Sequence, residues 1–257
     1  EIYNYRALRE RLEKKGHRFA TATDTEVIVH LYEEEGVDCV KSLRGMFAFA
    51  IWDLRQELLF LARDRIGIKP LYFCENREGI VFGSELRALL AVEGLARDLN
   101  PQAVAEYFTH LCVPGDLSIY QSVRKLLPGH VLIFQGGKSR ISRYWSLKMA
   151  PDFQVKESEW IEQLQGYFTD AVTSHMVADV PVGAFLSGGV DSGSMVAIMA
   201  KYSSVPVRTF TVGFKTGAGR FDETAAARAV ALRYHTQHHE CLLEADIAEL
   251  FPRVVGA

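Results

Sequence analysis

The chain has 257 residues, of which 48% are hydrophobic and 24% are charged, and its net charge is −3. This composition is typical of a globular protein with one large or two modest domains. The slightly acidic net charge argues against a nucleic-acid-binding protein, which would carry a basic surface. The sequence contains no run of about 18 apolar residues, so it does not predict a membrane-spanning helix. We therefore expect neither nucleic acid nor a membrane as a partner.

The four cysteines are dispersed along the chain at Cys39, Cys74, Cys112 and Cys241. Their spacing contains no Cys-x-x-Cys pair, which argues against a zinc cage or a disulfide framework. Reduced thiols of this kind indicate a cytoplasmic protein in which most cysteines pack as small apolar residues.

The first part of the chain predicts two helices. Leu8 and Leu12 fall on one face of a helix over residues 5–15. Thr23 and Glu26 have the spacing of a capping box, which predicts the start of a second helix.

An antiparallel sheet is expected after these helices, because short apolar runs alternate with turn residues. The runs are residues 46–54, 58–62, 71–74 and 80–82. Two further helices are predicted over residues 84–91 and 100–110, the second with Pro101 in its first turn. A hairpin over residues 131–144 follows.

Composition changes at residues 148–157, a polar stretch that we interpret as a linker. It separates a first domain at 1–147 from a second at 158–257. The second domain begins with an amphipathic helix that Ser158 is expected to cap. The apolar stripe of this helix consists of Ile161, Leu164, Phe168, Ala171 and Val172.

Strands and helices then alternate along the second domain. They are a strand over 180–186, a helix over 192–201, a strand over 207–214 and a helix over 223–233. This order predicts a parallel sheet with helices on its faces.

The sharpest motif is Ser187-Gly188-Gly189-Val190-Asp191-Ser192, at the junction of the first of these strands and its helix. A helix N-terminus offers unpaired N–H groups and a partial positive charge, and paired glycines let the backbone approach an anion. Hydroxyl groups add further donors. We therefore predict a pyrophosphate cradle formed by Ser187, Gly188, Gly189, Asp191 and Ser192. The alternative is an ordinary glycine-rich turn, which the strand-to-helix setting disfavours.

No Gly-Lys-Ser/Thr follows the loop, so the motif is not a Walker A sequence. It has the signature of the PP-loop ATP pyrophosphatases, which cleave ATP between the α and β phosphates. Leu186 precedes the loop, and Val212-Gly213 ends the next strand, where ligands of open parallel sheets bind. We expect these residues to contact the adenine or the ribose, and core packing is an equally good account of Val212.

Several motifs, in their order and spacing, resemble the glutamine-hydrolysing asparagine synthetases. They are Glu1-Ile2-Tyr3-Asn4, Leu43-Arg44-Gly45-Met46-Phe47-Ala48-Phe49-Ala50, Arg63-Asp64-Arg65-Ile66-Gly67-Ile68-Lys69-Pro70-Leu71-Tyr72 and the phosphate loop. Residues 107–130, with Val123-Arg124-Lys125-Leu126 and Pro128-Gly129-His130, look closest to the amidotransferase branch linked to exopolysaccharide and exosortase systems. The resemblance covers essentially the whole chain.

That family joins a class II glutaminase domain, an Ntn-type αββα sandwich, to an α/β PP-loop synthetase domain of the adenine nucleotide α-hydrolase-like type. The resemblance implies part of each domain here. It also implies that a cysteine releases ammonia from glutamine and that ATP converts a carboxylate into an acyl-adenylate, which the ammonia attacks. The implied cofactors are ATP and Mg²⁺, and the implied substrates are L-glutamine and L-aspartate or another carboxylate. A homodimer is one option for the assembly.

Functional residues carry over individually from this resemblance. Glu1 matches the glutamate of the Asn-Gly-Glu glutamine-binding motif, and Asp24 matches the aspartate that pairs with the α-amino group of glutamine. Helix capping is the other reading of Asp24, and both roles can coexist. Leu186 and Val212 match ATP-contacting positions, and Asp191 is a candidate Mg²⁺ ligand.

The departures from the family are substantial. The N-terminal cysteine, the arginine that binds the glutamine carboxylate and the later Ser-Gly-Glu-Gly-x-Asp-Glu segment have no counterpart, and Gly193 stands where a second serine is common. We expect the chain to be a fragment that is inactive alone. We also weighed a tRNA-modifying or sulfur-transferring PP-loop protein, a nucleotide-binding remnant without activity and a β-lactam-forming relative.

Four weaker signals received simpler interpretations. The histidines of His235-x-x-His238-His239 have poor spacing for a metal site, and Asp222-Glu223 is expected to cap a helix. Arg63-Asp64-Arg65 is interpreted as an internal ion-pair cluster, and Glu33-Glu34-Glu35 as a solvated helix end.

Overall fold

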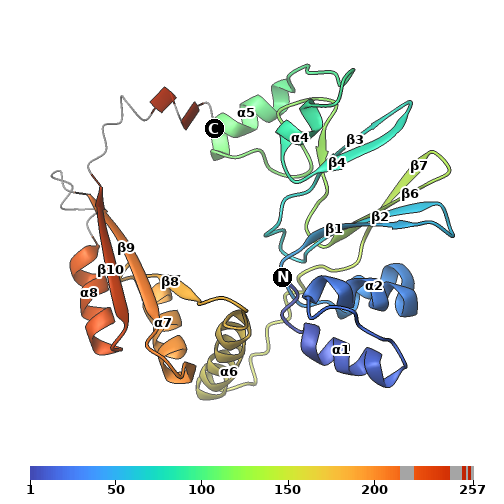
Figure 1. Cartoon of the computed structure of the whole chain (residues 1–257). Helices are drawn as coiled ribbons and strands as arrows, with labels where there is room; N and C mark the ends of the chain where they lie inside the picture. The colour runs from blue at the N-terminus through green and yellow to red at the C-terminus, as the bar shows by residue number, and fades with distance from the viewer. Residues whose placement is uncertain (215–222, 244–250, 253, 256–257) are drawn as a thin grey trace. The chain divides into compact units, whose positions relative to one another are not determined.

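The computed structural model describes residues 1–214, 223–243, 251–252 and 254–255 (Figure 1). The chain divides into two compact units, Glu1–Pro151 and Asp152–Ala257, and each is described by itself. No helix within the described ranges combines the length and apolarity that crossing a membrane requires.

The first unit is built in the order helices, sheet, sheet and helix (Figure 1), which is the layer order that the resemblance implies. Its larger sheet has the strand order β1-β2-β6-β7, and its smaller sheet has the order β4-β3-β5. The pairings within both sheets are antiparallel. The helices are α1 (Tyr5–Lys14), α2 (Asp24–Glu35), η1 (Gly36–Asp38), α3 (Cys39–Ser42), α4 (Leu86–Leu90) and α5 (Pro101–His110). The strands are β1 (Ala48–Asp53), β2 (Leu58–Arg63), β3 (Tyr72–Asn76), β4 (Gly79–Gly83), β5 (Arg124–Lys125), β6 (His130–Gln135) and β7 (Lys138–Arg143).

Strand β2 lies between the two halves of this core, because successive side chains of a strand point to opposite faces. Phe60 packs with Leu12 of α1 and Leu31 of α2, whereas its neighbour Leu61 packs with Phe73 of the second sheet. All of these side chains are buried. Burying each of them is worth roughly 1.5–3 kcal/mol, so this strand joins both layers.

Helix α1 ends in a turn that requires glycine. Gly16 has φ +97°, and its N–H donates to the carbonyl of Glu13 at 2.9 Å. The N–H of His17 returns to the carbonyl of Leu12 at 3.1 Å. These two bonds satisfy carbonyls at the end of the helix and fix the position of His17.

Helix α2 starts at the predicted cap but only half of the capping box forms. The Thr23 hydroxyl accepts the N–H of Glu26 at 3.4 Å. The Glu26 carboxylate instead accepts the N–H groups of Ala20 and Thr21, at 2.6 and 2.7 Å. Residues 33–35 form a solvated helix end, as expected, where Glu34 and Glu35 also form exposed ion pairs with Lys15 and Arg11.

The segment Arg63-Asp64-Arg65 is held by main-chain groups. Asp64 is fully buried, and its carboxylate accepts five backbone N–H groups at 2.6–3.3 Å. These donors are Phe47, Ile66, Gly67, Ile68 and Lys69. The Arg63 guanidinium donates to three backbone carbonyls, and that of Arg65 to two. Main-chain groups are therefore the hydrogen-bond partners of side chains that we expected to form ion pairs with one another, although Arg65 Nε is buried without a partner in the part of the chain that the structure describes.

The second unit contains a parallel sheet with the strand order β10-β9-β8. Its elements are α6 (Glu157–His175), β8 (Gly183–Phe185), α7 (Val190–Tyr202), β9 (Arg208–Phe214), α8 (Thr224–Arg233) and β10 (Gln237–Leu243). Strand β8 is shorter than the expected 180–186, because Pro181 has no N–H group for the ladder.

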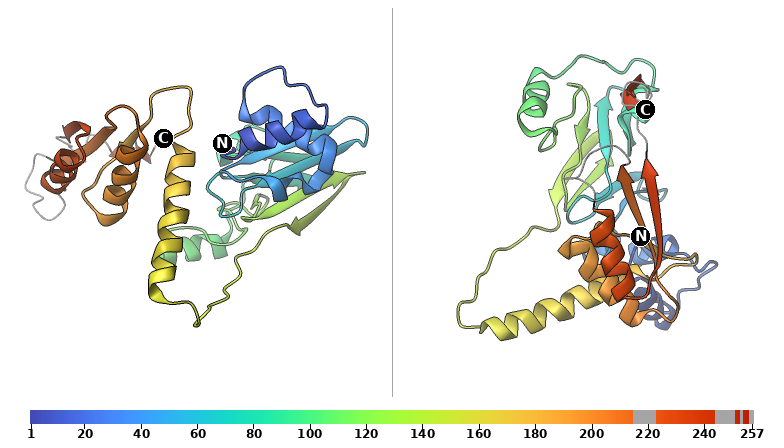
Figure 2. Two further views of the ribbon diagram at one scale, coloured as in Figure 1. Left: turned by 90° about the horizontal axis from the view of Figure 1, so that it is seen from below. Right: turned by 90° about the vertical axis from the view of Figure 1, so that its left-hand side faces the viewer.

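Helices α7 and α8 lie on the same face of this sheet, as Figure 2 shows, where we expected helices on both faces. The reason is topological. Both crossovers step in the same direction, from β8 to β9 to β10, and right-handed crossovers that step the same way place their helices on one side. Within the described residues, the other face of the sheet carries exposed side chains such as Phe185 and Phe210.

Helix α6 begins before the residue that we expected to cap it. Lys156 has extended geometry and is the N-cap, so Ser158 lies in the first turn. Of the predicted stripe, Val172 is buried in the core with α7, and Phe168 packs against that core. Ile161 and Leu164 are 49% and 67% exposed, so only the C-terminal half of the stripe is covered within the second unit.

Candidate functional site: a serine–glycine loop at a strand-to-helix junction

The segment 187–192, called the loop below, runs from the end of β8 into the first turn of α7. Gly188 has φ +79°, and Gly189 is the extended N-cap of α7. The helix therefore begins at Val190, earlier than the expected residue 192. The predicted motif thus lies at a strand-to-helix junction and at a helix N-terminus.

The two serine side chains of the loop face each other. Their Oγ atoms are 2.9 Å apart, and the backbone N–H of Ser187 donates to Ser192 Oγ at 3.3 Å. The N–H of Gly189 points to Ser187 Oγ at 3.4 Å, a long and weak contact. Ser187, Gly189 and Asp191 are exposed, so the loop is open to a ligand.

Gly188 allows the loop to lie against helix α8. A Cβ at this position would be 2.6 Å from the Cβ of Ala226 and 2.8 Å from the nitrogen of Ala227. Both the positive φ and the contact with backbone atoms therefore require glycine. The loop is held between its own strand and a helix that follows later in the chain.

Leu186 is placed by β9 and faces the core. Its N–H donates to the carbonyl of Phe210 at 2.9 Å, and its carbonyl accepts the hydroxyl of the buried Thr211. Its side chain is 1% exposed, on the face that α7 and α8 cover. The side chain of Leu186 is therefore part of the core and is not available to a ligand at the end of the strand.

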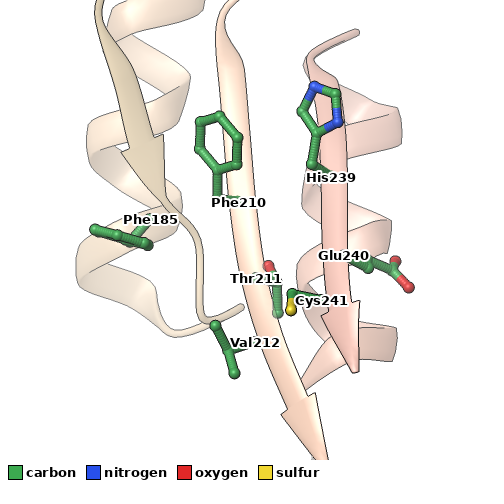
Figure 3. A pocket seen from close by; sticks show the side chains of 7 residues that line it. All are labelled: Phe185, Phe210, Thr211, Val212, His239, Glu240 and Cys241. Atoms are coloured by element: carbon green, nitrogen blue, oxygen red, sulfur yellow. The ribbon is translucent and has the colours of Figure 1, made fainter. Parts of the chain in front are cut away.

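Val212 and Gly213 lie in β9 beside the loop, because the β8–β9 register pairs Phe185 with Phe210. The side chain of Val212 is 48% exposed and points to the opposite face from Leu186. There it lines a pocket shown in Figure 3, in which the rings of Phe210 and His239 stack with centroids 5.2 Å apart. The pocket is lined by Phe185, Phe210, Thr211, Val212, His239, Glu240 and Cys241.

The sequence motifs did not identify Phe185, Phe210 or His239 as pocket residues. Alternation along β8 and β9 was the available signal, since Ala184, Thr209 and Thr211 are buried between these exposed positions. Glu240, at the rim, accepts two hydrogen bonds from Arg228 of α8, at 2.8 and 2.6 Å. These bonds lower the pKa of the Glu240 carboxyl.

The candidate metal residues of this unit lie apart. Asp191 is exposed in the first turn of α7. His238 Nδ1 is 2.9 Å from the hydroxyl of Thr209, whereas His239 lies on the opposite face of β10. Glu223 is the N-cap of α8 without a side-chain capping bond, and Asp222 lies outside the described residues.

The predicted glutamine-binding residues are neighbours in the first unit. The carboxylate of Asp24, at the start of α2, accepts the N–H of Ile2 at 2.8 Å. Residues 1–3 pair with 44–46, and a Cβ on Gly45 would lie 2.0 Å from the carbonyl oxygen of Glu1. Gly45 therefore lets the chain bring Glu1 alongside Asp24.

Comparison with known proteins gives each unit a family. A family model described as a glutamine amidotransferase domain matches residues 1–145, and one described as asparagine synthase matches residues 163–257. The chain belongs to the glutamine-hydrolysing asparagine synthetase family.

Curated relatives within this asparagine synthetase family align along most of the chain. "Putative asparagine synthetase [glutamine-hydrolyzing] 2" from Methanocaldococcus jannaschii is 39% identical over 98% of this chain and 49% of its own length. "Asparagine synthetase [glutamine-hydrolyzing] 3" from Bacillus subtilis is 34% identical over 95% of this chain and 42% of its own length. The chain thus spans about half the length of these relatives.

Two of the cysteines in this asparagine synthetase relative are buried and poorly suited to nucleophilic attack. Burial raises the pKa of the Cys39 thiol to about 12, and burial also raises the pKa of Cys74. The thiolate is the nucleophilic form, so the raised pKa values make both residues poor nucleophiles. Cys112 and Cys241 are exposed.

Proposed function

We propose that this protein takes part in the ATP-dependent amidation of a carboxylate, with ammonia from glutamine and with L-aspartate as the first acceptor to test. The observation that carries the proposal is the Ser187–Ser192 loop at the N-terminus of α7. We place the reaction in the cytoplasm and assign the second unit to the PP-loop type.

The loop residues fit the pyrophosphate end of ATP. The facing hydroxyls of Ser187 and Ser192 can turn toward phosphate oxygens, and the first N–H groups of α7 favour an anion. Asp191 has an exposed carboxylate in the same turn and would hold Mg²⁺, which neutralises charge on the departing pyrophosphate. The exposed face of Val212 and Phe210 would accommodate the adenine ring.

The proposed chemistry has two steps at the acceptor. A carboxylate oxygen attacks the α-phosphorus of ATP, the α–β bridging bond breaks, and pyrophosphate leaves. Ammonia then attacks the acyl carbon, loses a proton, and AMP leaves with the bonding electrons. Activation is needed because a free carboxylate has no good leaving group.

In the first unit, Glu1 and Asp24 would bind glutamine. The Oδ2 atom of Asp24 accepts the N–H of Ile2, while Oδ1 has only a long 3.4 Å contact with the Thr25 hydroxyl. Oδ1 can therefore accept a hydrogen bond from the α-ammonium group of glutamine, which is the role that the family resemblance implies for Asp24. A homodimer is part of the same proposal and is tested by measuring the mass in solution.

An isotope experiment tests the amidation. L-Aspartate labelled with ¹⁸O in its side-chain carboxylate is incubated with the full-length protein, ATP, Mg²⁺ and ammonium, and the nucleotide products are analysed by mass spectrometry. We expect AMP that carries one ¹⁸O atom. ADP together with phosphate that carries one ¹⁸O atom would show attack at the γ-phosphorus and would overturn the proposed α–β cleavage.

A competition experiment and a substrate panel distinguish the proposed amidation of aspartate from two other functions. Pyrophosphate competes with ATP if the loop is a pyrophosphate cradle, whether or not amidation follows. Competition without turnover of aspartate would favour a nucleotide-binding remnant or a different carboxylate acceptor, such as an exopolysaccharide-related acid. A panel of carboxylates in the same isotope assay separates these two outcomes.

A further inference from the structure

Two histidines and a glutamate meet at the helical layer of the first unit, and none of the three is assigned above to ATP or glutamine. His17 follows the glycine turn that ends α1, and His30 and Glu33 lie one turn apart on α2. The i, i+3 spacing places the two α2 side chains on one face. The imidazoles of His17 and His30 are 15% and 17% exposed.

The three facing atoms form a nearly regular triangle. His17 Nδ1 is 3.2 Å from His30 Nδ1, His30 Nδ1 is 2.9 Å from Glu33 Oε2, and His17 Nδ1 is 3.5 Å from Glu33 Oε2. A tetrahedral zinc ion with bonds of 2.0–2.2 Å separates its ligand atoms by roughly 3.3–3.6 Å. The triangle is slightly smaller than one face of a zinc coordination sphere, so small outward shifts of the side chains would fit the ion.

The outer nitrogens of both imidazoles face carboxylates. His17 Nε2 is 3.0 Å from Glu34 Oε1, and His30 Nε2 is 3.7 Å from Glu26 Oε1. At His17, a proton on Nε2 donates to Glu34 and leaves the Nδ1 lone pair for the triangle, whereas His30 Nε2 is too far from Glu26 Oε1 for a direct hydrogen bond. Histidine ligands of metal ions usually donate their second N–H in this way.

Packing and charge reinforce this arrangement. The ring of Phe19 lies 4.6 Å from that of His30 at an interplanar angle of 67°, which restricts the orientation of the imidazole. Glu34 is anchored by Lys15, and Glu26 by the N–H groups of Ala20 and Thr21. Glu33 is 56% exposed, so solvent can reach the triangle as a further ligand.

We propose that His17, His30 and Glu33 bind a zinc-class divalent ion, with water as the fourth ligand. The ion joins the connection between α1 and α2 to the body of α2, and it acts as a structural clasp. This inference rests on the geometry of the first unit alone and does not depend on the proposed amidation.

The test uses tag-free, metal-stripped protein of the full chain with Cys112→Ser and Cys241→Ser, because exposed thiols bind metal ions. Zn²⁺ is titrated by calorimetry, and Co²⁺ is added separately to record its visible spectrum. We expect one equivalent of Zn²⁺ to bind, the intense absorption bands of tetrahedral cobalt, and a higher midpoint of thermal unfolding with zinc.

Variants locate the site. His17→Gln and His30→Gln are expected to abolish stoichiometric binding, and Glu34→Gln to weaken it about 10- to 100-fold by removing a partner of a ligand. His110→Gln is the matched control, because His110 pairs with Glu106 at 3.3 Å on α5 but belongs to no such triangle among the described residues. Circular dichroism without metal checks that each variant is folded.

Two results would overturn the proposal. One is the failure of the parent protein to bind an equivalent of Zn²⁺. The other is equal Zn²⁺ affinity in the parent and in folded His17→Gln, which would leave the triangle as a hydrogen-bonded cluster only.

Discussion

The hydroxyls of Ser187 and Ser192 lie 2.9 Å apart across the loop between β8 and α7. Each hydroxyl can satisfy the other in the free protein and can turn toward an anion when one binds. The pair connects the strand end to the first turn of the helix, so the proposed phosphate would contact both ends of the loop.

Ser192→Ala removes one of these hydroxyls and is expected to weaken the binding of ATP with Mg²⁺ roughly 10- to 100-fold, the range for a hydrogen bond to a charged group. Calorimetric titration measures the effect. The matched control is Ser203→Ala at the other end of α7, where the hydroxyl donates to the carbonyl of Val205 at 2.6 Å. An unchanged affinity of Ser192→Ala for ATP with Mg²⁺ would contradict the assignment of this loop to the nucleotide site.

Substitution by alanine should change the free energy of unfolding in opposite directions at Gly188 and Gly193. At Gly188 the positive φ and the close approach of Ala226 make the substitution unfavourable, and we expect a loss of about 2 kcal/mol or more in the free energy of unfolding. At Gly193, inside α7, the nearest atoms to a new Cβ are 3.9 Å away, and we expect a gain of about 0.5 kcal/mol. Urea denaturation measures both, and a gain at Gly188 would contradict the packing against α8.

Asp64→Ala should be among the most damaging single changes in the first unit. It leaves five N–H groups around a buried site without their acceptor, and we expect a loss of roughly 3 kcal/mol or more. Asp64→Asn keeps the shape of the side chain but replaces one acceptor oxygen by a donor NH₂ group. Its free energy of unfolding should therefore lie between those of wild type and Asp64→Ala. Equal stability of wild type and Asp64→Ala in urea would contradict this assignment.

Tyr144→Phe tests a buried phenol. The hydroxyl donates to the carbonyl of Arg63 at 2.8 Å, and burial raises the pKa of Tyr144 above its usual value of 10.0. Because the folded state holds the proton more tightly, the stabilisation is fully present below pH 10.0 and is lost as the pH rises above it. We expect the free energy of unfolding of wild type to exceed that of Tyr144→Phe by about 1 kcal/mol at pH 7. This difference should shrink in alkaline solution, and urea denaturation across the pH range measures it. A difference that grows above pH 10 would refute the raised pKa.

Local patterns in the sequence predicted most of the elements of the first unit. Apolar runs between turn residues located β1 to β4, because strand alternation and turn chemistry are short-range properties. Asn100 and Pro101 located the start of α5, where the Asn100 side chain accepts the N–H groups of Gln102 and Ala103. The hexapeptide located the serine–glycine loop for the same reason.

Features that depend on distant partners could not be read this way. The triangle of His17, His30 and Glu33 joins the residue after the α1 turn to α2. Neither the separation of the two histidines in the sequence nor the i, i+3 spacing of His30 and Glu33 is a metal-binding motif by itself. The single covered face of the parallel sheet depends on the order of its strands. Glu1 and Asp24 were paired only through the family resemblance, and their role in binding glutamine stays a prediction.

Residues 64–69 form a loop whose main chain is fixed by one internal carboxylate, while Ile66 and Ile68 are 69% and 51% exposed. The outward side chains contribute little to the shape of the backbone that carries them. Selection or engineering can therefore exchange these two residues and alter what the loop displays without redesigning its conformation. Gly67, which is closed in by Pro128, is the one position in the loop tip where such exchange is blocked.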